Sequence, residues 1–308
     1  MGEIALRSRP AAAAAQAIGA EPAGKLEPGL YVVATPIGNL GDLSRRALAT
    51  LAAVDAVVCE DSRVTGLLLH RFGIDRPMLV YNDHTAARLR PELIDRLRRG
   101  GALALVSDAG TPTISDPGYR LVKEAHEAGV PVRAVPGPCA PIAALSIAGL
   151  PTDRFLFAGF LPPRRDARRR ALADLRSVPV TLLLLERGTR LADLLADAAE
   201  ILGDRPAAIA RELTKLHEEL RRGRLAELAA AATAAPPPKG EIVVVIGPPE
   251  EPAAEIGERA VETALLEASA RLPPGRAARE VAAVTGRPAE ELYRRLVELG
   301  RARRGGRP

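Results

Sequence analysis

Three short segments of the chain combine glycine with proline directly after an apolar run: ATPIGNLGDLS (34–44), SDAGTPTISDPG (107–118) and PGPCAP (136–141). Proline fixes the local backbone and glycine lets a ligand approach it closely, so each segment can offer main-chain donors and acceptors to a small molecule. Asp108 lies beside Gly110 and Thr111, and its carboxylate can accept hydrogen bonds from a ligand hydroxyl or amine. Taken singly, each segment also fits an ordinary turn, because Asp, Gly and Pro are the commonest turn residues.

The residue types exclude several other kinds of site. No loop has the spacing G-x-G-x-x-G or G-x-x-x-x-G-K-S/T, which argues against an ordinary dinucleotide site and a P-loop. Cys59 and Cys139 lie 80 positions apart, too scattered for a disulfide framework or a zinc site, and a reducing compartment fits them. The spacing of the histidines forms no ligand set, so we expect no metal; they are His70, His84, His126 and His217.

The elements that must position these loops alternate along the first half of the chain. Apolar runs at 30–34, 55–60, 78–81, 102–107 and 130–135 predict strands, and helical spacing appears at 44–54, 84–99 and 117–128. Continuously apolar strands separated by helices predict a parallel sheet covered on both faces. Because ligands usually bind beyond the carboxyl ends of such strands, we expect the three loops to converge on one rim of the sheet.

Beyond this first α/β domain, which we place at 29–150, the pattern changes. Strand runs adjoin one another without long crossovers, which predicts a second α/β domain over 151–248 with a mixed sheet. We expect a linker at 249–258, a basic helical module and tail at 259–308, and a disordered N-terminal extension at 1–28. The sequence has no apolar run long enough to span a membrane and no recognisable signal peptide, so we expect a cytoplasmic protein.

The positive charge of the chain belongs to its C-terminal part. The formal net charge is +5, but residues 271–308 alone hold ten Arg and four Glu, and the remaining 270 residues hold 33 basic and 34 acidic groups. A basic appendage on a near-neutral body is typical of nucleic-acid binding. The cluster RRDARRR (164–170) is a second candidate phosphate-binding surface. For either charge run the alternative is a merely solvated face.

Three stretches carry a family resemblance: LYVVATPIGNLGDLSRRALATLAAVDAVVCEDSRVTGLLLHRFGI (30–74), LVSDAGTPTISDPGYRLV (105–122) and VPGPCAPIAALSIAGLPTDRFLFAGFLP (135–162). Through them the chain resembles the ribosomal small subunit methyltransferase I family, part of the tetrapyrrole methylase superfamily. The resemblance covers about residues 29–247, with a weaker match near 291–299. It implies S-adenosylmethionine-dependent methylation of a cytidine ribose 2′-hydroxyl in the decoding centre of 16S rRNA, by two α/β domains with the donor in the cleft between them. Dimers are common in the superfamily, so we expect a homodimer.

The resemblance also nominates site residues. For the donor it implies Asp108, Gly110, Thr111, Pro138, Cys139 and Ala140, with Leu185 and Ala210 closing over the adenine from the second domain. For the substrate it implies Thr35, Pro36, Asn39, Arg63, Tyr119, Arg211, Lys215 and Lys239. The chain departs from the family in the segment LERGTR (185–190), which lacks the aromatic residue and the His that the family often has there. Any role of that His in the family therefore cannot be transferred to this chain.

A weak nucleophile such as a 2′-hydroxyl benefits from a proton acceptor, and a carboxylate can serve. The candidates are Glu60, Asp61 and Asp116, and the sequence does not rank them. Asp116 also has a purely structural interpretation, as a helix N-cap with Pro117 at the first helical position. Asp61, which precedes Ser62, can be a helix cap in the same way.

Two other functions compete with rRNA methylation. Methylation of a small tetrapyrrole is disfavoured by the TPIGN segment, by the basic tail, and by an aromatic content of 3%, which leaves little for a macrocycle to stack on. A non-catalytic RNA-binding protein fits the basic tail, but it leaves the three glycine- and proline-rich loops without a role.

Overall fold

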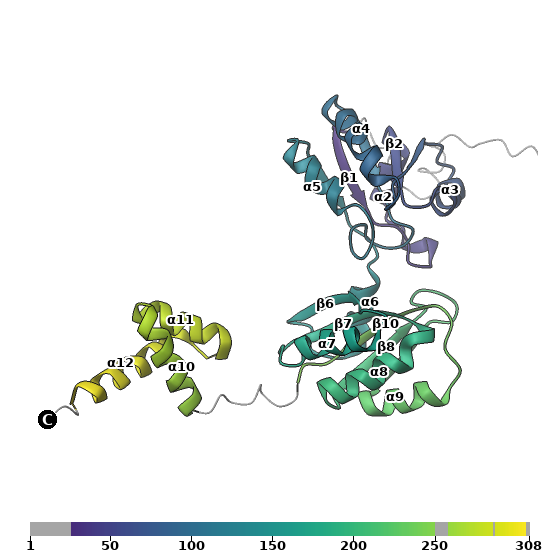
Figure 1. The fold of residues 1–308 in the computed structure, drawn as a ribbon. Helices are drawn as coiled ribbons and strands as arrows, with labels where there is room; N and C mark the ends of the chain where they lie inside the picture. The colour runs from purple at the N-terminus through teal and green to yellow at the C-terminus, as the bar shows by residue number, and fades with distance from the viewer. Residues whose placement is uncertain (1–25, 250–257, 286, 306–308) are drawn as a thin grey trace, which may run out of the picture.

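The computed structural model describes residues 26–249, 258–285 and 287–305. Two α/β units and a group of C-terminal helices follow one another along the chain (Figure 1). Most of the expected extension at 1–28 and of the expected linker at 249–258 lies outside the described residues, and Glu258 already belongs to a helix.

The first sheet is wholly parallel, with strand order β3-β2-β4-β1-β5. Its strands are β1 (Gly29–Val33), β2 (Ala56–Cys59), β3 (Met78–Val80), β4 (Ala102–Leu105) and β5 (Val132–Val135). Strands β2 and β4 are buried along their whole length. This burial on both faces explains why their sequences are continuously apolar instead of alternating.

Helices cover both faces of this sheet, and the two helices on one face begin at side-chain caps. Alternate strand residues such as Val33 and Val57 pack against α2 (Arg45–Ala53) and α3 (Ser62–Arg71). The intervening residues, such as Leu103, pack against α4 (Ala86–Arg98) and α5 (Tyr119–Glu127). A 3-10 turn, η1 (Leu40–Asp42), precedes α2, and the Ser44 hydroxyl caps α2 by accepting from the Ala47 amide at 3.1 Å.

The second sheet is mixed, with strand order β6-β7-β10-β8-β9. Strand β6 runs parallel to β7, and each further neighbour is antiparallel. The strands are β6 (Phe155–Phe160), β7 (Thr181–Arg187), β8 (Pro206–Arg211), β9 (Glu219–Arg224) and β10 (Glu241–Ile246). A βαβ crossover joins β6 to β7, whereas β8 runs on to β9 through a short loop, so this sheet can be mixed where the first cannot.

The two faces of the second sheet have different partners. Helix α6 (Ala140–Ala148) packs with Ile37 against the face that looks toward the first unit, and it ends at the left-handed Gly149, φ 64° (Figure 1). The opposite face is covered by α7 (Arg165–Leu175), α8 (Gly188–Leu202) and α9 (Leu225–Ala234). The side of the sheet next to α6 is therefore where residues of both units meet.

The arginine cluster at 164–170 is partly engaged inside this second unit, and Arg164, Arg165 and Arg170 are exposed. Arg168 is 3% exposed, and its Nη2 lies 2.8 Å from Oδ2 of Asp197 on α8. Arg169 contacts the same carboxylate at 3.0 Å and Glu200 at 2.6 Å. Arg168 and Arg169 therefore tie α7 to α8, and only the exposed arginines of the cluster stay candidates for phosphate contacts.

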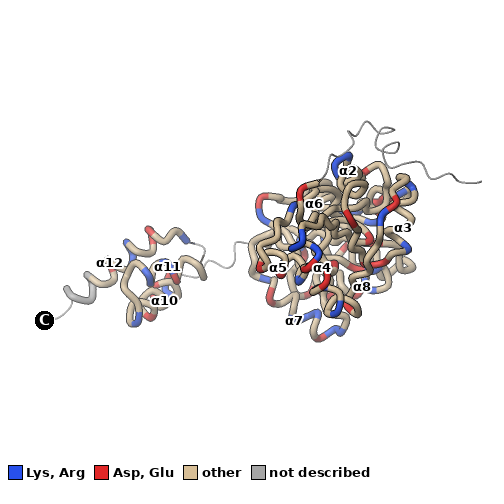
Figure 2. Tube along the Cα trace, turned by 90° about the horizontal axis from the view of Figure 1, so that it is seen from above, with Lys and Arg blue, Asp and Glu red and all other residues tan. Residues whose placement is uncertain are grey.

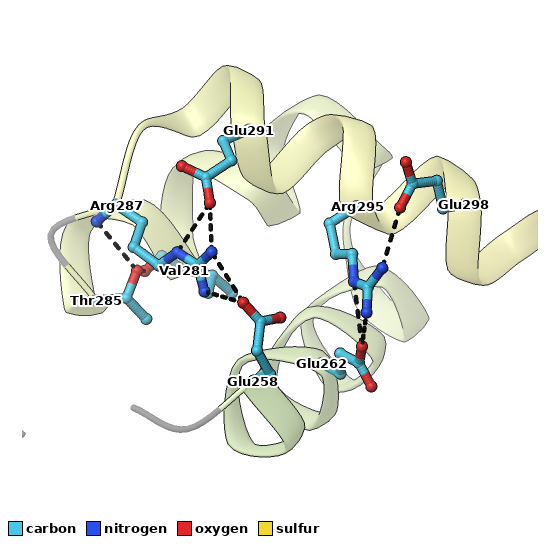
Figure 3. Close-up of polar contacts among 8 residues, drawn as sticks. All are labelled: Glu258, Glu262, Val281, Thr285, Arg287, Glu291, Arg295 and Glu298. Carbon is cyan, nitrogen blue, oxygen red and sulfur yellow. Dashed lines mark hydrogen bonds and ion pairs between the residues drawn. The ribbon is translucent and has the colours of Figure 1, made fainter. Parts of the chain in front are cut away.

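The C-terminal helices form a bundle with its own apolar core: α10 (Glu258–Arg271), α11 (Pro274–Thr285) and α12 (Ala289–Gly305). Ion pairs fasten the helices to one another. Arg287 contacts Glu258 and Glu291, and Arg295 contacts Glu262 at 2.5 Å and Glu298 at 3.1 Å (Figure 3). Acidic residues alternate with basic ones over the bundle (Figure 2), so part of its positive charge is balanced internally.

Candidate functional site

Backbone and side-chain hydrogen bonds tie the three glycine- and proline-rich loops together. The Thr35 amide donates to the Gly110 carbonyl at 2.8 Å, and the Gly110 amide donates back to the Thr35 carbonyl at 3.1 Å. The Thr111 hydroxyl donates to the carbonyl of Pro138 at 2.9 Å. The expected convergence of the loops on one rim is confirmed, and the tie between them is made at Gly110 and Thr111.

A cavity of about 340 Å³ opens between these loops and the second sheet. Seven of the predicted donor-site residues line it: Asp108, Gly110, Thr111, Cys139, Ala140, Leu185 and Ala210. Pro138 is held next to it through its bond from Thr111. Such a volume falls within the range of small-molecule sites. We call this space the donor cavity.

Several lining residues were missed by the sequence reasoning. From the first unit they include Ile37, Ile114 and Ser115, and from the second unit Phe160, Leu213, Gly240 and Val243. The second-unit side chains are apolar residues on or beside strands, and nothing in the sequence separates them from core residues. The family pattern around LERGTR was the available signal, and it marked the end of β7 at Leu185.

The loop between β4 and α5 holds an unusual backbone. Thr113 and Ser115 adopt φ of 72° and 65°, values that side chains other than glycine rarely take. The helix after this loop begins at Tyr119 with Gly118 as its N-cap, φ 126°, and no side chain caps it. The prediction of Asp116 as N-cap and Pro117 as first helical residue is therefore wrong. Gly118 also packs tightly on Leu105, because an added Cβ there would lie only 2.7 Å from the Leu105 Cδ2.

Because Asp116 does not cap α5, its side chain is available to the donor cavity, which it lines. It lies in an acidic cluster with Asp108 and Glu60. Burial and, to a smaller extent, the charge of Glu60 raise the pKa of Asp116 to about 6, and the Ser107 hydroxyl opposes this shift. Burial also raises the pKa of Asp108 and that of Glu60, and the charge of Asp61 adds to both shifts. Among these three carboxylates, the large shift in pKa is that of Asp116.

Asp61 has a different role. It is the N-cap of α3, where its Oδ1 accepts from the Arg63 amide at 2.8 Å, and the Arg63 guanidinium contacts both of its oxygens. The side-chain bonds from Arg63 lower the pKa of Asp61 to about 2. Its own amide donates to Oδ1 of Asp108 at 3.2 Å. Asp61 therefore supports Asp108 and has little affinity for a proton.

A second cavity of about 510 Å³ adjoins the donor cavity, and we call it the α3 cavity. Both are lined by Ile37, Asp108, Ala109 and Glu241. The predicted substrate residues Thr35, Pro36 and Lys215 line the α3 cavity, together with apolar side chains of α3. The Lys215 side chain crosses Gly38, where an added Cβ would collide with it, and its Nζ lies 3.0 Å from Glu212 and 3.4 Å from Glu241.

The structure does not bring every predicted substrate residue to these cavities. Asn39 caps η1 by accepting from the Gly41 amide, the Arg63 side chain is 89% exposed, and Tyr119 is 68% exposed on α5. Arg211 is engaged with Glu219 and with the carbonyl of Lys239, away from both cavities. In LERGTR, Glu186 is buried and lies 3.0 Å from Arg190.

The described part of the chain holds neither a cluster of metal ligands nor a membrane span. Among the residues that the structure describes, no three His, Cys, Asp or Glu side chains gather closely enough to hold a metal ion. No helix in the described ranges is both long and apolar enough to cross a bilayer.

Two family models match the chain. The model of the Tetrapyrrole (Corrin/Porphyrin) Methylases matches residues 29–229, and that of the RsmI C-terminal HTH domain matches residues 255–300. The first covers both α/β units up to α9, and the second covers the C-terminal bundle. The second match agrees with the expectation that a basic helical module follows the two α/β units.

Curated relatives match over nearly the whole chain. A ribosomal RNA small subunit methyltransferase I from Mesorhizobium japonicum is 52% identical, covering 90% of this chain and 94% of that protein. Proteins of the same name from Erythrobacter litoralis and Xylella fastidiosa are 51% and 48% identical, covering 89% and 86% of this chain and 96% and 97% of their own lengths.

Solved structures share the fold at low identity. A diphthine synthase superposes with a TM-score of 0.56 at 20% identity, covering 71% of this chain and 89% of its own. A cobalt precorrin-4 methyltransferase superposes with a TM-score of 0.52 at 19% identity, covering 71% of this chain and 94% of its own. These likenesses establish the arrangement of the two α/β units.

Proposed function

The chain belongs to the ribosomal RNA small subunit methyltransferase I family and is an S-adenosylmethionine-dependent rRNA methyltransferase; from this premise we propose that it methylates the ribose 2′-hydroxyl of a cytidine in the decoding centre of 16S rRNA. The observation that carries the proposal is the donor cavity, whose rim of three tied loops directly adjoins a second cavity of suitable size for a nucleotide.

The residues of the donor cavity fit S-adenosylmethionine. Gly110 has φ 86°, and a Cβ there would lie 3.3 Å from Ile37, so only glycine keeps this part of the cavity open. Leu185, Ala210 and Val243 give the second unit an apolar wall suited to a flat adenine, and the Asp108 carboxylate can accept from hydroxyl or amino groups. When bound, the donor supplies a methyl group on a positively charged sulfur.

We assign the proton-accepting role to Asp116. It lines the donor cavity, and its pKa of about 6 makes it unprotonated at neutral pH yet still able to hold a proton. Asp108, on the border of the two cavities, orients the reactants, and Asp61 holds Asp108 through its amide. The remaining task of the enzyme is alignment of the reacting groups, for which positioning alone contributes about 7–11 kcal/mol in well-oriented systems. No residue of the site needs a metal for this chemistry, and we propose that none is used.

The RNA is proposed to meet the protein on two parts of its surface. One is the neighbourhood of the α3 cavity, with Thr35, Pro36 and Lys215. The other is the C-terminal bundle, on which Arg276, Arg279 and Arg294 are exposed. We further propose that the enzyme acts in the cytoplasm, where its ribosomal substrate is, and that it works as a homodimer.

The decisive experiment supplies labelled S-adenosylmethionine and small ribosomal subunits from cells that lack the enzyme. We expect label in 16S rRNA, and mapping by alkaline hydrolysis places it at one cytidine whose 2′-oxygen is blocked. Label on a base, or on a tetrapyrrole offered in parallel and not on RNA, contradicts the proposal.

A second experiment tests the C-terminal bundle. Deletion of residues 256–308 removes helices with a core of their own, so the α/β units are expected to keep their fold. We expect the KM for small subunits to rise while the Kd for S-adenosylmethionine, measured by calorimetry, is unchanged. An equal loss of both affinities means that the bundle is structural.

A further inference from the structure

The α3 cavity has apolar walls, which a surface that only contacts RNA phosphates does not need. Besides Ile37 it is lined by Leu40, Val64, Leu67 and Leu68. Three of these side chains are strongly exposed: Leu40 by 43%, Val64 by 44% and Leu67 by 71%. A contiguous exposed apolar patch around a cavity marks a binding surface, in contrast to single exposed leucines, which are common.

The polar groups at this cavity are placed at its edges. Arg71 lies at the C-terminal end of α3, and Lys215 enters from the second unit across Gly38. On the opposite side, Asp108 and Glu241 form the border with the donor cavity. Lys215 is paired with Glu212 and Glu241, so a ligand that fits this distribution has a flat, largely apolar part, an anionic part for Arg71, and a hydroxyl group that reaches Asp108.

A nucleotide of the RNA has these three parts. We propose that the α3 cavity receives a single nucleotide unstacked from the rRNA, with its base against Val64 and Leu68, its phosphate near Arg71, and its ribose at the Asp108 border. This inference rests on the proposed function and adds that the target nucleotide leaves its stack. Leu67, the most exposed of the apolar side chains that line the cavity, is assigned as the wedge that fills the space left in the RNA.

The competing occupant of an apolar face is a second copy of this chain. Two observations favour the nucleotide. The α3 cavity is continuous with the donor cavity through four shared lining residues, so a subunit seated on it would close the route between donor and substrate. Such a subunit would also bury Arg71, whereas an RNA phosphate pairs with it.

The inference is tested by substitutions that alter the α3 cavity at residues outside the lining of the donor cavity. Val64→Phe adds bulk at a position that is 44% exposed, and the matched control Ile147→Phe makes the same kind of change at a 43% exposed position of α6, outside the lining of both cavities. Leu67→Glu is a second variant, at a position exposed enough to accept a charge. Each protein is assayed with small ribosomal subunits and labelled S-adenosylmethionine, and its donor Kd, melting temperature and sedimentation are measured.

For Val64→Phe and Leu67→Glu we expect kcat/KM for small subunits to fall at least about tenfold, with the donor Kd within about twofold of wild type. Ile147→Phe should resemble wild type in every measurement. Folded cavity variants with wild-type kcat/KM overturn the inference, and so does a variant that changes from dimer to monomer, which makes this face a subunit interface. If the wild-type enzyme itself places no label in rRNA, the proposed function fails instead.

Discussion

The ends of β2 and β4, neighbouring strands of one sheet, both carry acidic residues, but the structure gives these acids opposite properties. After β2, Asp61 is bound by Arg63 and has its pKa lowered to about 2. After β4, Asp116 is half-buried beside Glu60 and has its pKa raised to about 6. The two acids share a residue type, and their pKa values differ because Asp61 is bound by Arg63 whereas Asp116 is buried beside Glu60.

A helix starts shortly after both acids, but the two starts are built differently. At α3, Asp61 is the N-cap, and the cap places its carboxylate beside the Arg63 amide and guanidinium. At α5, Gly118 takes the N-cap position and leaves Asp116 two residues outside the helix, free to enter the donor cavity. Capping therefore removes one acid from proton chemistry, and the absence of a side-chain cap makes the other available for it.

Replacing the acid after β4 should have the largest effect. We expect Asp116→Asn to lower kcat on small subunits by about 10²- to 10⁴-fold, the usual contribution of a positioned proton acceptor. Burial raises the pKa of Asp116, so its charge opposes folding above about pH 6, and the variant should melt at a higher temperature than wild type at pH 7.5. Thermal unfolding and single-turnover methylation measure the two effects. Near-wild-type kcat in Asp116→Asn removes this residue from the mechanism.

Asp108 follows β4 and accepts a hydrogen bond from the amide of Asp61, which follows β2, so it links the two strand ends. Asp108 also lines both cavities. We expect Asp108→Ala to weaken binding of S-adenosylmethionine by roughly 10- to 150-fold, the range for losing a hydrogen bond to a charged group. Calorimetry gives the Kd directly, and Asp42→Ala, on the exposed η1 turn, is the control. Unchanged donor affinity in Asp108→Ala would place this acid on the substrate side alone.

The pH dependence of the wild-type enzyme separates the two acids. A proton acceptor must be unprotonated, so kcat should rise with pH through about 6 and level off above it, with about a tenfold loss for each unit below. Asp61 stays ionised over this whole range and contributes no inflection. The residual activity of Asp116→Asn should lack the inflection, and an unshifted profile in that variant means that another group titrates.

Replacing the acid after β2 should have the smallest effect. Asn is as good an N-cap as Asp, so Asp61→Asn keeps the start of α3. The variant also keeps the hydrogen bond from its backbone amide to Asp108, and it loses only an exposed ion pair with Arg63. We expect activity within about twofold of wild type and an almost unchanged melting temperature. A loss as large as that of Asp116→Asn would reverse the assignment of the two acids.

The parts of this site that were predictable from the sequence are those in which local residue type determines the structure. The loops at Thr35, Gly110 and Pro138 follow strands and contain glycine and proline, so their place on one rim could be predicted. Leu213 and Val243 could not, because an apolar side chain that lines a cavity has the same pattern as one that lines a core. The start of α5 was missed because the Asp-Pro pair, which has the pattern of a helix cap, lies in the loop, and the helix begins after Gly118 without a side-chain cap.

The ion pairs of the C-terminal bundle have a consequence for how the enzyme responds to ionic strength. Arg271, Arg287 and Arg295 are held by glutamates of the same bundle, so they are not free to neutralise RNA phosphates. Each phosphate contact releases condensed counterions and steepens the dependence of affinity on salt concentration. The complex with rRNA should therefore lose affinity with added salt less steeply than ten arginines in residues 271–308 would suggest.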